Sequence, residues 1–123
     1  MMTVAKSKGA IGCVFDGAIR DVDAFEKHQF PCWARGINMR GPYKDGPGFI
    51  NVPINIGGMV VNPGDVILGD CDGVIALSPA DALQGAKLGK EKEITERKTI
   101  QSILDGKYDD SWVDATLKQK GVL

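Results

Sequence analysis

The hydrophobic pattern of the chain predicts strands over its first two thirds and helices over the rest. Short apolar runs bounded by Gly predict strands at 11–15 and 31–35, with a short helix at 21–28 between them. Apolar residues alternate strictly with polar or small ones over 50–56, which predicts a strand with one buried face. Three more short apolar runs follow, each closed by a Gly turn, and predict a meander of antiparallel strands: 59–61, 66–68 and 74–77.

Helical signals frame this strand-rich region. Ser78-Pro79-Ala80-Asp81 combines an N-cap Ser with Pro at the first helical position, so we predict a long helix over about 79–105 and a second helix over about 110–120. Residues 3–9 look like the last turns of a helix closed by a Gly. The segment 36–48 is rich in Gly, Pro and charge and is predicted to be a long loop. The whole chain, 1–123, is expected to form a single α/β domain.

Composition narrows the class of protein. The chain has 123 residues, 43% of them hydrophobic, and a net charge of -1, so nothing indicates binding of nucleic acid. Asp16 follows the first apolar run too closely for a signal peptide, and Pro and Gly interrupt the uncharged stretch 46–64, so no membrane association is expected. The cysteine spacing matches no zinc or disulfide pattern. Together these features predict a cytoplasmic protein with reduced thiols.

Common catalytic signatures are absent. The chain contains no G-x-S-x-G, H-E-x-x-H or P-loop sequence. Its single histidine, His28, is expected to be solvated or to end a helix. The segment 70–73 (DCDG) begins like a calcium loop, but the later ligands do not follow, so a turn held by the Asp side chains is expected.

Arg20 and Asp21 are the candidate functional residues. They stand between a predicted strand and a predicted helix, which places a guanidinium and a carboxylate side by side. Arg presents a planar fork to a carboxylate, and one Asp can hold Mg²⁺ if water and substrate oxygens complete its coordination. Taken alone, such a pair at a helix start is more often a helix cap and a structural ion pair than a binding site.

Several motifs in a fixed order resemble one known family. They are 9–21 (GAIGCVFDGAIRD), 30–36 (FPCWARG), 40–42 (RGP), 51–54 (NVPI), 57–58 (GG), 61–65 (VNPGD) and 69–74 (GDCDGV). Together they resemble the family that joins 4-hydroxy-4-methyl-2-oxoglutarate aldolases to the regulator of ribonuclease E activity (RraA). The resemblance covers nearly the whole chain from Gly9.

The resemblance implies a fold, an activity and roles for the candidate residues. The implied fold is the swivelling β/β/α fold of RraA-like proteins, akin to phosphohistidine domains, here lacking its N-terminal segment. The implied assembly is a homotrimer or a dimer of trimers. The implied activity is a class II aldolase that uses Mg²⁺ or Mn²⁺, releases pyruvate from a 2-oxo acid substrate and decarboxylates oxaloacetate as a side activity. Asp21 then holds the metal, and Arg20 contacts the keto acid.

Two points of the resemblance leave alternatives open. In the family, a Gly-rich loop and an acidic residue upstream of the matching part complete the site, and a neighbouring subunit can lend a further acid. Glu93 and Glu96 are the candidates for that acid, although both also fit a solvated helix face. The alternatives are a regulatory protein that binds ribonuclease E, or an inactive truncated member. Asp21 favours an enzyme, because regulators of the enteric type lack a carboxylate at this position.

Overall fold

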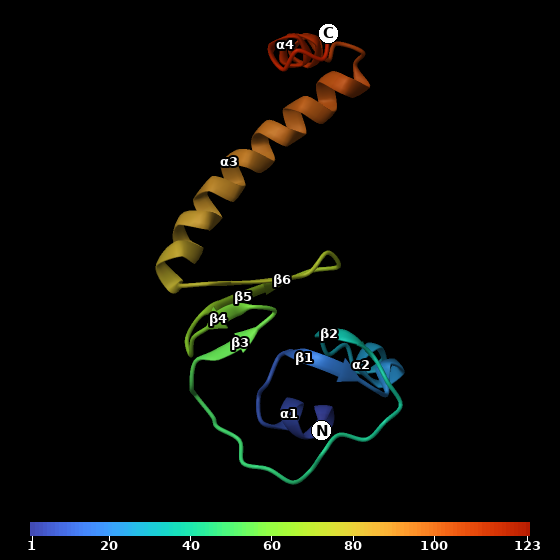
Figure 1. Cartoon of the computed structure of the whole chain (residues 1–123), viewed down its shortest axis with the longest axis vertical. Helices are drawn as coiled ribbons and strands as arrows, with labels where there is room; N and C mark the ends of the chain where they lie inside the picture. Colours follow the sequence, from blue (N-terminus) through green and yellow to red (C-terminus); the bar gives the residue numbers. More distant parts are fainter. The chain divides into compact units, whose positions relative to one another are not determined.

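A computed structural model describes residues 1–123 as two compact units, Met1–Pro79 and Ala80–Leu123. The first unit holds all the strands and the second is helical (Figure 1). In chain order the elements are α1 (Met2–Ser7), β1 (Cys13–Ile19), α2 (Val22–Lys27), β2 (Cys32–Ile37), β3 (Ile54–Ile56), β4 (Met59–Val61), β5 (Val66–Gly69), β6 (Val74–Leu77), α3 (Pro79–Leu104) and α4 (Ser111–Gln119).

The first two strands pair in parallel. β1 and β2 are joined by α2, so they form a short strand–helix–strand crossover with Cys13 opposite Cys32. The register shifts between Phe15 and Ala18, which marks a bulge at Asp16 and Gly17. Such a bulge turns the strand locally and re-aims the side chains beside it.

The other strands form two antiparallel hairpins. β3 pairs with β4 through a turn at Gly57 and Gly58, which both have positive φ. β5 pairs with β6 through the turn 70–73, where Asp70 Oδ1 accepts hydrogen bonds from the Asp72 and Gly73 amides at 2.8 and 3.2 Å. The predicted side-chain-held turn at 70–73 is therefore confirmed.

One contact joins the crossover to the second hairpin. The Trp33 indole on β2 donates a hydrogen bond from Nε1 to the Asp70 carbonyl oxygen at 2.8 Å. A Cβ built on Gly69 would lie 2.5 Å from Trp33 Cζ2, which is closer than real Cβ contacts. Only a glycine leaves room for the ring at this point of β5.

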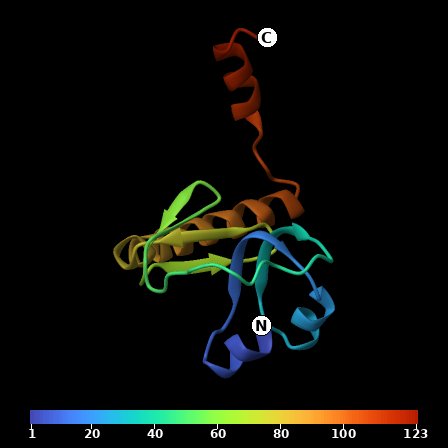
Figure 2. The ribbon, with the colours of Figure 1, turned by 60° about the horizontal axis from the view of Figure 1, so that its bottom comes forward.

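The core of the first unit is small. Phe30 is its buried hydrophobic residue, at 3% exposure, and its ring centroid lies 6.4 Å from that of Phe25 on α2. Figure 2 shows α2 beside the β1–β2 pair, where this cluster forms. Large side chains of the loop that follows β2 are exposed instead: Met39, Tyr43, Phe49 and Ile50.

The second unit consists of α3 and α4. Ion pairs one turn apart run along α3, such as Arg97 Nη2 with Glu93 Oε1 at 2.6 Å. Both helices lie within about a residue of their predicted bounds, because their start and stop signals are local. None of the helices is both long and apolar enough to cross a membrane.

Three predictions about the strands were wrong. Residues 50–53 are not part of a strand, because Asn51 has a φ of 55° and Pro53 has no amide hydrogen to donate to a ladder. β1 does not end at Phe15 but continues through Asp16 and Gly17 as the bulge. The predicted meander is in fact two separate hairpins.

Candidate active site

Asp21 lies between β1 and α2 in an uncommon backbone conformation. Its φ and ψ are 60° and 41°, in the left-handed region that few non-glycine residues adopt. It occupies the N-cap position of α2, but its side chain makes no capping hydrogen bond. The carboxylate is 74% exposed. The alternative of a side-chain cap therefore does not apply, and the carboxylate is presented to solvent.

Arg20 is the polar neighbour of this carboxylate. Its Nε lies 3.6 Å from Asp21 Oδ2, and the side chain is 53% exposed. An ion pair so exposed contributes little to stability. A Cβ built on Gly41 would lie 3.9 Å from Arg20 Nη1, so the loop between β2 and β3 passes beside the guanidinium. Arg20 is thus flanked by Asp21 on one side and this loop on another.

Asp16 anchors both ends of that loop. One carboxylate oxygen accepts a hydrogen bond from Arg35 Nε on β2, before the loop, and the other accepts one from the Gly57 amide at 3.2 Å, after it. The Arg35 hydrogen bond, followed by that from Gly57, holds the pKa of Asp16 below its ordinary value of 3.8. The hydrogen bond with Asp16, followed by the negative charge of Asp16, raises the pKa of Arg35. Asp16 therefore stays ionised and ties β2 to the turn between β3 and β4, on either side of the loop.

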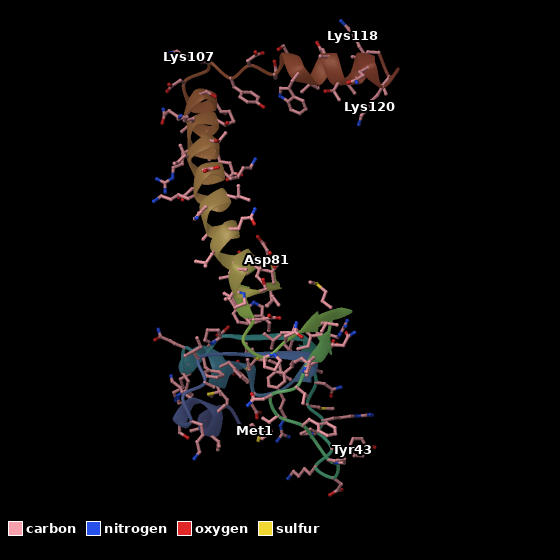
Figure 3. All side chains as sticks on the ribbon, turned by 90° about the vertical axis from the view of Figure 1, so that its left-hand side faces the viewer. Met1, Tyr43, Asp81, Lys107, Lys118 and Lys120 are labelled. Atoms are coloured by element: carbon pink, nitrogen blue, oxygen red, sulfur yellow. The ribbon has the colours of Figure 1, made fainter.

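The loop carries apolar side chains that the first unit leaves uncovered. Tyr43 is fully exposed, and Figure 3 shows it on the loop, away from the sheets. Met39 and Ile50 are each 90% exposed. Exposed apolar side chains in this number are typical of a surface that binds another molecule.

The donor set at Asp21 suits a hard divalent cation with few protein ligands. No group of three or more His, Cys, Asp or Glu side chains in the chain is arranged to hold a metal. Mg²⁺ does not need one, because it keeps several waters and is often bound by one or two carboxylates plus substrate oxygens. The single exposed carboxylate of Asp21 fits that mode, with Arg20 beside it to meet an anionic substrate.

The two glutamates predicted to serve the site of a neighbouring subunit lie in the second unit. Glu93 and Glu96 are on α3, where Glu93 pairs with Arg97 and Glu96 Oε1 lies 3.7 Å from Lys92 Nζ. Both side chains are more than half exposed. The structure thus brings Arg20 and Asp21 together, while a role for the two glutamates at the site stays a prediction.

Sequence reasoning missed the Asp16–Arg35 pair. Asp16 follows the predicted strand 11–15 and Arg35 ends the predicted strand 31–35, and no pattern in the sequence pairs them. In the parallel register Phe15 lies opposite Ala34, and the residues that follow them, Asp16 and Arg35, carry opposite charges. Opposite charges at such facing positions are the signal that could have found the pair. Finding it required knowing the register of two strands that are not adjacent in sequence.

Comparison with known proteins places the chain in a family. The RraA-like model, described as Aldolase/RraA, matches residues 1–76. The chain belongs to the RraA-like family. The matched residues contain the whole β1–α2–β2 crossover, with Arg20, Asp21 and Asp16. The resemblance noted from the motifs is therefore confirmed.

Relatives with curated names agree with this placement. A protein of Halalkalibacterium halodurans named "Putative 4-hydroxy-4-methyl-2-oxoglutarate aldolase" is 37% identical over 105 residues, which are 85% of this chain and 50% of that protein. An uncharacterized protein of Methanocaldococcus jannaschii is 40% identical, over 83% of this chain and 49% of its own length. The chain spans about half the length of these two relatives.

A solved structure supports the fold. An uncharacterized protein from Pseudomonas syringae pv. tomato aligns with a TM-score of 0.77 and 29% sequence identity, over 86% of this chain and 50% of that chain. The predicted swivelling α/β fold of RraA-like proteins is therefore confirmed for the aligned part.

Proposed function

We propose that this chain carries the metal- and substrate-binding residues of a divalent-metal-dependent aldolase. Its substrates are 4-hydroxy-2-oxo acids such as 4-hydroxy-4-methyl-2-oxoglutarate, and its product is pyruvate. Decarboxylation of oxaloacetate, which also yields pyruvate, is a side activity of the same site. Membership of the RraA-like family and the aldolase name of one relative support the reaction class.

One observation carries the proposal. Asp21 occupies a left-handed N-cap position without using its side chain as a cap, and its carboxylate is three-quarters exposed beside Arg20. A residue held in such a conformation costs free energy, which the surrounding structure must repay. Asp tolerates this conformation better than most residues, and here its carboxylate is neither used as a cap nor buried in an ion pair. It is therefore available to a ligand.

The roles of the residues follow from their chemistry. Asp21 would hold Mg²⁺ or Mn²⁺ by one carboxylate oxygen, and a bound ion of this kind would supply Lewis-acid stabilisation of the negative charge that develops on the substrate. Arg20 binds and orients the anionic keto acid through its guanidinium fork. Asp16 would act indirectly, by bonding to Arg35 before the loop and to Gly57 after it.

Other parts of the proposal concern assembly. A homotrimer, or a dimer of trimers, would cover the exposed apolar side chains of the loop after β2. It would also let Glu93 or Glu96 of one subunit serve the site of another. Mass measured by light scattering tests the assembly, and a monomer at micromolar concentration would contradict it.

The activity is tested by the release of pyruvate from 4-hydroxy-4-methyl-2-oxoglutarate and from oxaloacetate, coupled to lactate dehydrogenase. The assay is run with Mg²⁺, with Mn²⁺ and with a chelator. We expect turnover only with metal, and a loss of about 10²-fold or more in Asp21→Asn, the scale of removing one charge-stabilising group. Asn suits the test because it tolerates a left-handed backbone, whereas Ala would add strain.

A matched control separates the site from the general charge of α2. Asp23 lies two residues further on and is also an exposed carboxylate. Asp23→Asn is expected to keep the activity of the wild type. Metal-independent turnover, or equal activity of Asp21→Asn and wild type, would overturn the proposal.

A further inference from the structure

The two cysteines that begin β1 and β2 lie side by side. Cys13 and Cys32 are direct partners in the parallel register, so their side chains project from the same face of the strand pair. Neighbouring strands run about 4.8 Å apart. This spacing falls within the range of about 4.4–6.8 Å between Cα atoms that a disulfide can bridge.

Further contacts bring these two strand ends close together. The Cys13 amide donates to the Pro31 carbonyl oxygen at 3.0 Å, and the Cys13 thiol points at the same oxygen at 3.8 Å. A Cβ built on Gly12 would lie 3.2 Å from that oxygen. Because Gly12 has no side chain, the backbone at residue 12 can lie close to Pro31. This approach brings the Cys13 thiol to Pro31, the residue before Cys32.

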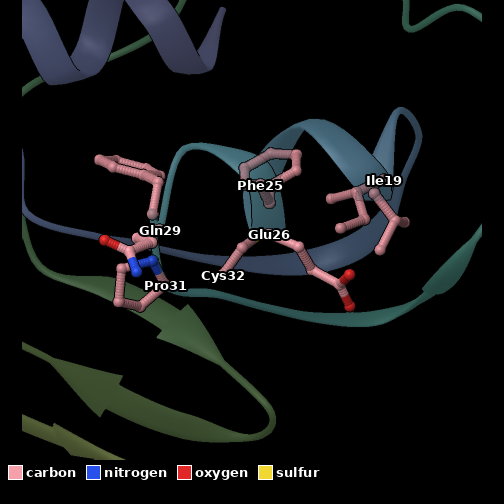
Figure 4. A pocket seen from close by; sticks show the side chains of 8 residues that line it. Ile19, Phe25, Glu26, Gln29, Pro31 and Cys32 are labelled. Atoms are coloured by element: carbon pink, nitrogen blue, oxygen red, sulfur yellow. The ribbon is translucent and has the colours of Figure 1, made fainter.

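Burial and the neighbouring Cys13 both change the acidity of the Cys32 thiol. Burial, followed by a hydrogen bond with Cys13 and the charge of Cys13, raises the pKa of Cys32 to about 12. Cys32 borders a hollow of about 460 Å³ between α2 and the start of β2 (Figure 4), with Phe25 and Glu26 on its helical side. Neither cysteine is fully buried.

We propose that Cys13 and Cys32 are an oxidation site, where a low-molecular-weight disulfide such as oxidised glutathione converts the two thiols into a reversible disulfide between β1 and β2. The deprotonated Cys13 sulfur attacks one sulfur of the small disulfide, forms a mixed disulfide and expels one glutathione thiolate. Cys32 gives its proton to solvent, attacks the Cys13 sulfur and expels the second glutathione. Two protein thiols are oxidised, and one small disulfide is reduced to two thiols.

Cys32 acts second because of its surroundings. A thiol whose pKa is about 12 is seldom ionised near neutral pH, so it is a poor group to start the exchange. Once Cys13 carries glutathione, its sulfur is held opposite Cys32 by the strand register. The bridge would close the segment 13–32, which contains α2, Arg20 and Asp21. Oxidation would therefore constrain the unfolded chain around the candidate site.

The chain offers a direct test by mass spectrometry. Trypsin cleaves after Lys8, Arg20, Lys27 and Arg35, so Cys13 and Cys32 fall in separate peptides, 9–20 and 28–35. The folded protein is incubated with oxidised glutathione, its remaining thiols are alkylated, and it is digested without reductant. We expect the peptides 9–20 and 28–35 joined by a disulfide, and an intact mass lower by two hydrogens. The reduced thiols should return with dithiothreitol.

Cys71 is the internal control. It is exposed in the turn between β5 and β6, and it falls in a third peptide. The disulfide should persist in Cys71→Ser and disappear in Cys13→Ser and in Cys32→Ser. The wild type with the disulfide should melt at a higher temperature than the reduced wild type. Bridges to Cys71, dimers linked through Cys13 or Cys32, or alkylation of both cysteines after oxidation would overturn the proposal. The wild-type peptide map decides even if a serine variant fails to fold.

Discussion

The contact between Trp33 and Gly69 is predicted to stabilise the first unit, and one added methyl group should break it. A Cβ at position 69 would lie 2.5, 2.8 and 2.9 Å from three atoms of the indole ring. The ring cannot simply move away, because its Nε1–H donates to the Asp70 carbonyl oxygen at 2.8 Å. Gly69→Ala must therefore shift β5 or displace the indole and strain that hydrogen bond.

The size of the effect follows from these two losses. Forcing one extra carbon into a packed contact costs about 1–3 kcal/mol. Loss of the hydrogen bond adds about 1 kcal/mol. We expect Gly69→Ala to lower the free energy of unfolding by about 2–4 kcal/mol, measured by urea denaturation at a fixed protein concentration. Trp33 fluorescence is followed in a Trp112→Phe background, because the chain has two tryptophans.

Gly36→Ala is the matched control. Gly36 is also a strand glycine of the same unit, its φ is not positive, and a Cβ built on it meets nothing within 4 Å. Gly36→Ala should keep or slightly raise the free energy of unfolding of the wild type, because Ala lowers the conformational entropy of the unfolded chain. If Gly69→Ala were as stable as Gly36→Ala, the contact described between Trp33 and β5 would be refuted.

Two further predictions concern charge and helix formation. Because the pKa of Asp16 is lowered on folding, its ionisation stabilises the fold above the ordinary value of 3.8, and this contribution is lost as the pH falls through the folded value. The difference in unfolding free energy between wild type and Asp16→Asn should therefore be largest near neutral pH and shrink in acid; a difference that grows in acid would refute the linkage. Gly85 lies inside α3 with open space at its Cβ. Gly85→Ala should stabilise α3 by about 0.5–1 kcal/mol, seen as greater helicity by circular dichroism, and a loss of helicity would contradict it.

The parts of the fold that were predictable from the sequence depend on local signals. The Ser78-Pro79 helix start and the Asp70 side chain act within a few residues of themselves, so α3 and the turn at 70–73 were predicted correctly. β3 was predicted too long because alternation alone indicated a strand. Pro53 and the left-handed Asn51 end the strand pattern there, whatever the alternation of side chains.

The candidate site was only partly predictable for a similar reason. Arg20 and Asp21 are adjacent in sequence, and the surrounding motif assigns their roles by resemblance. The left-handed backbone of Asp21 is a property of the folded connection between β1 and α2. Asp16 makes its bonds from the bulge of β1 beside β2. The β1–β2 pairing links residues about twenty positions apart, and the bond of Asp16 with the Gly57 amide spans 41 positions. Periodicity within one element carries no information about such contacts.

Binding of a divalent metal by Asp21 is the central claim. Titration with Mn²⁺, followed by the electron paramagnetic resonance signal of the free ion, measures this binding without any turnover. We expect saturable binding by the wild type and by Asp23→Asn. Binding should weaken at least about 10-fold in Asp21→Asn, because loss of a hydrogen-bond partner of a metal ligand already costs about that much. Equal binding by Asp21→Asn and wild type, or no binding by the wild type, would contradict the claim.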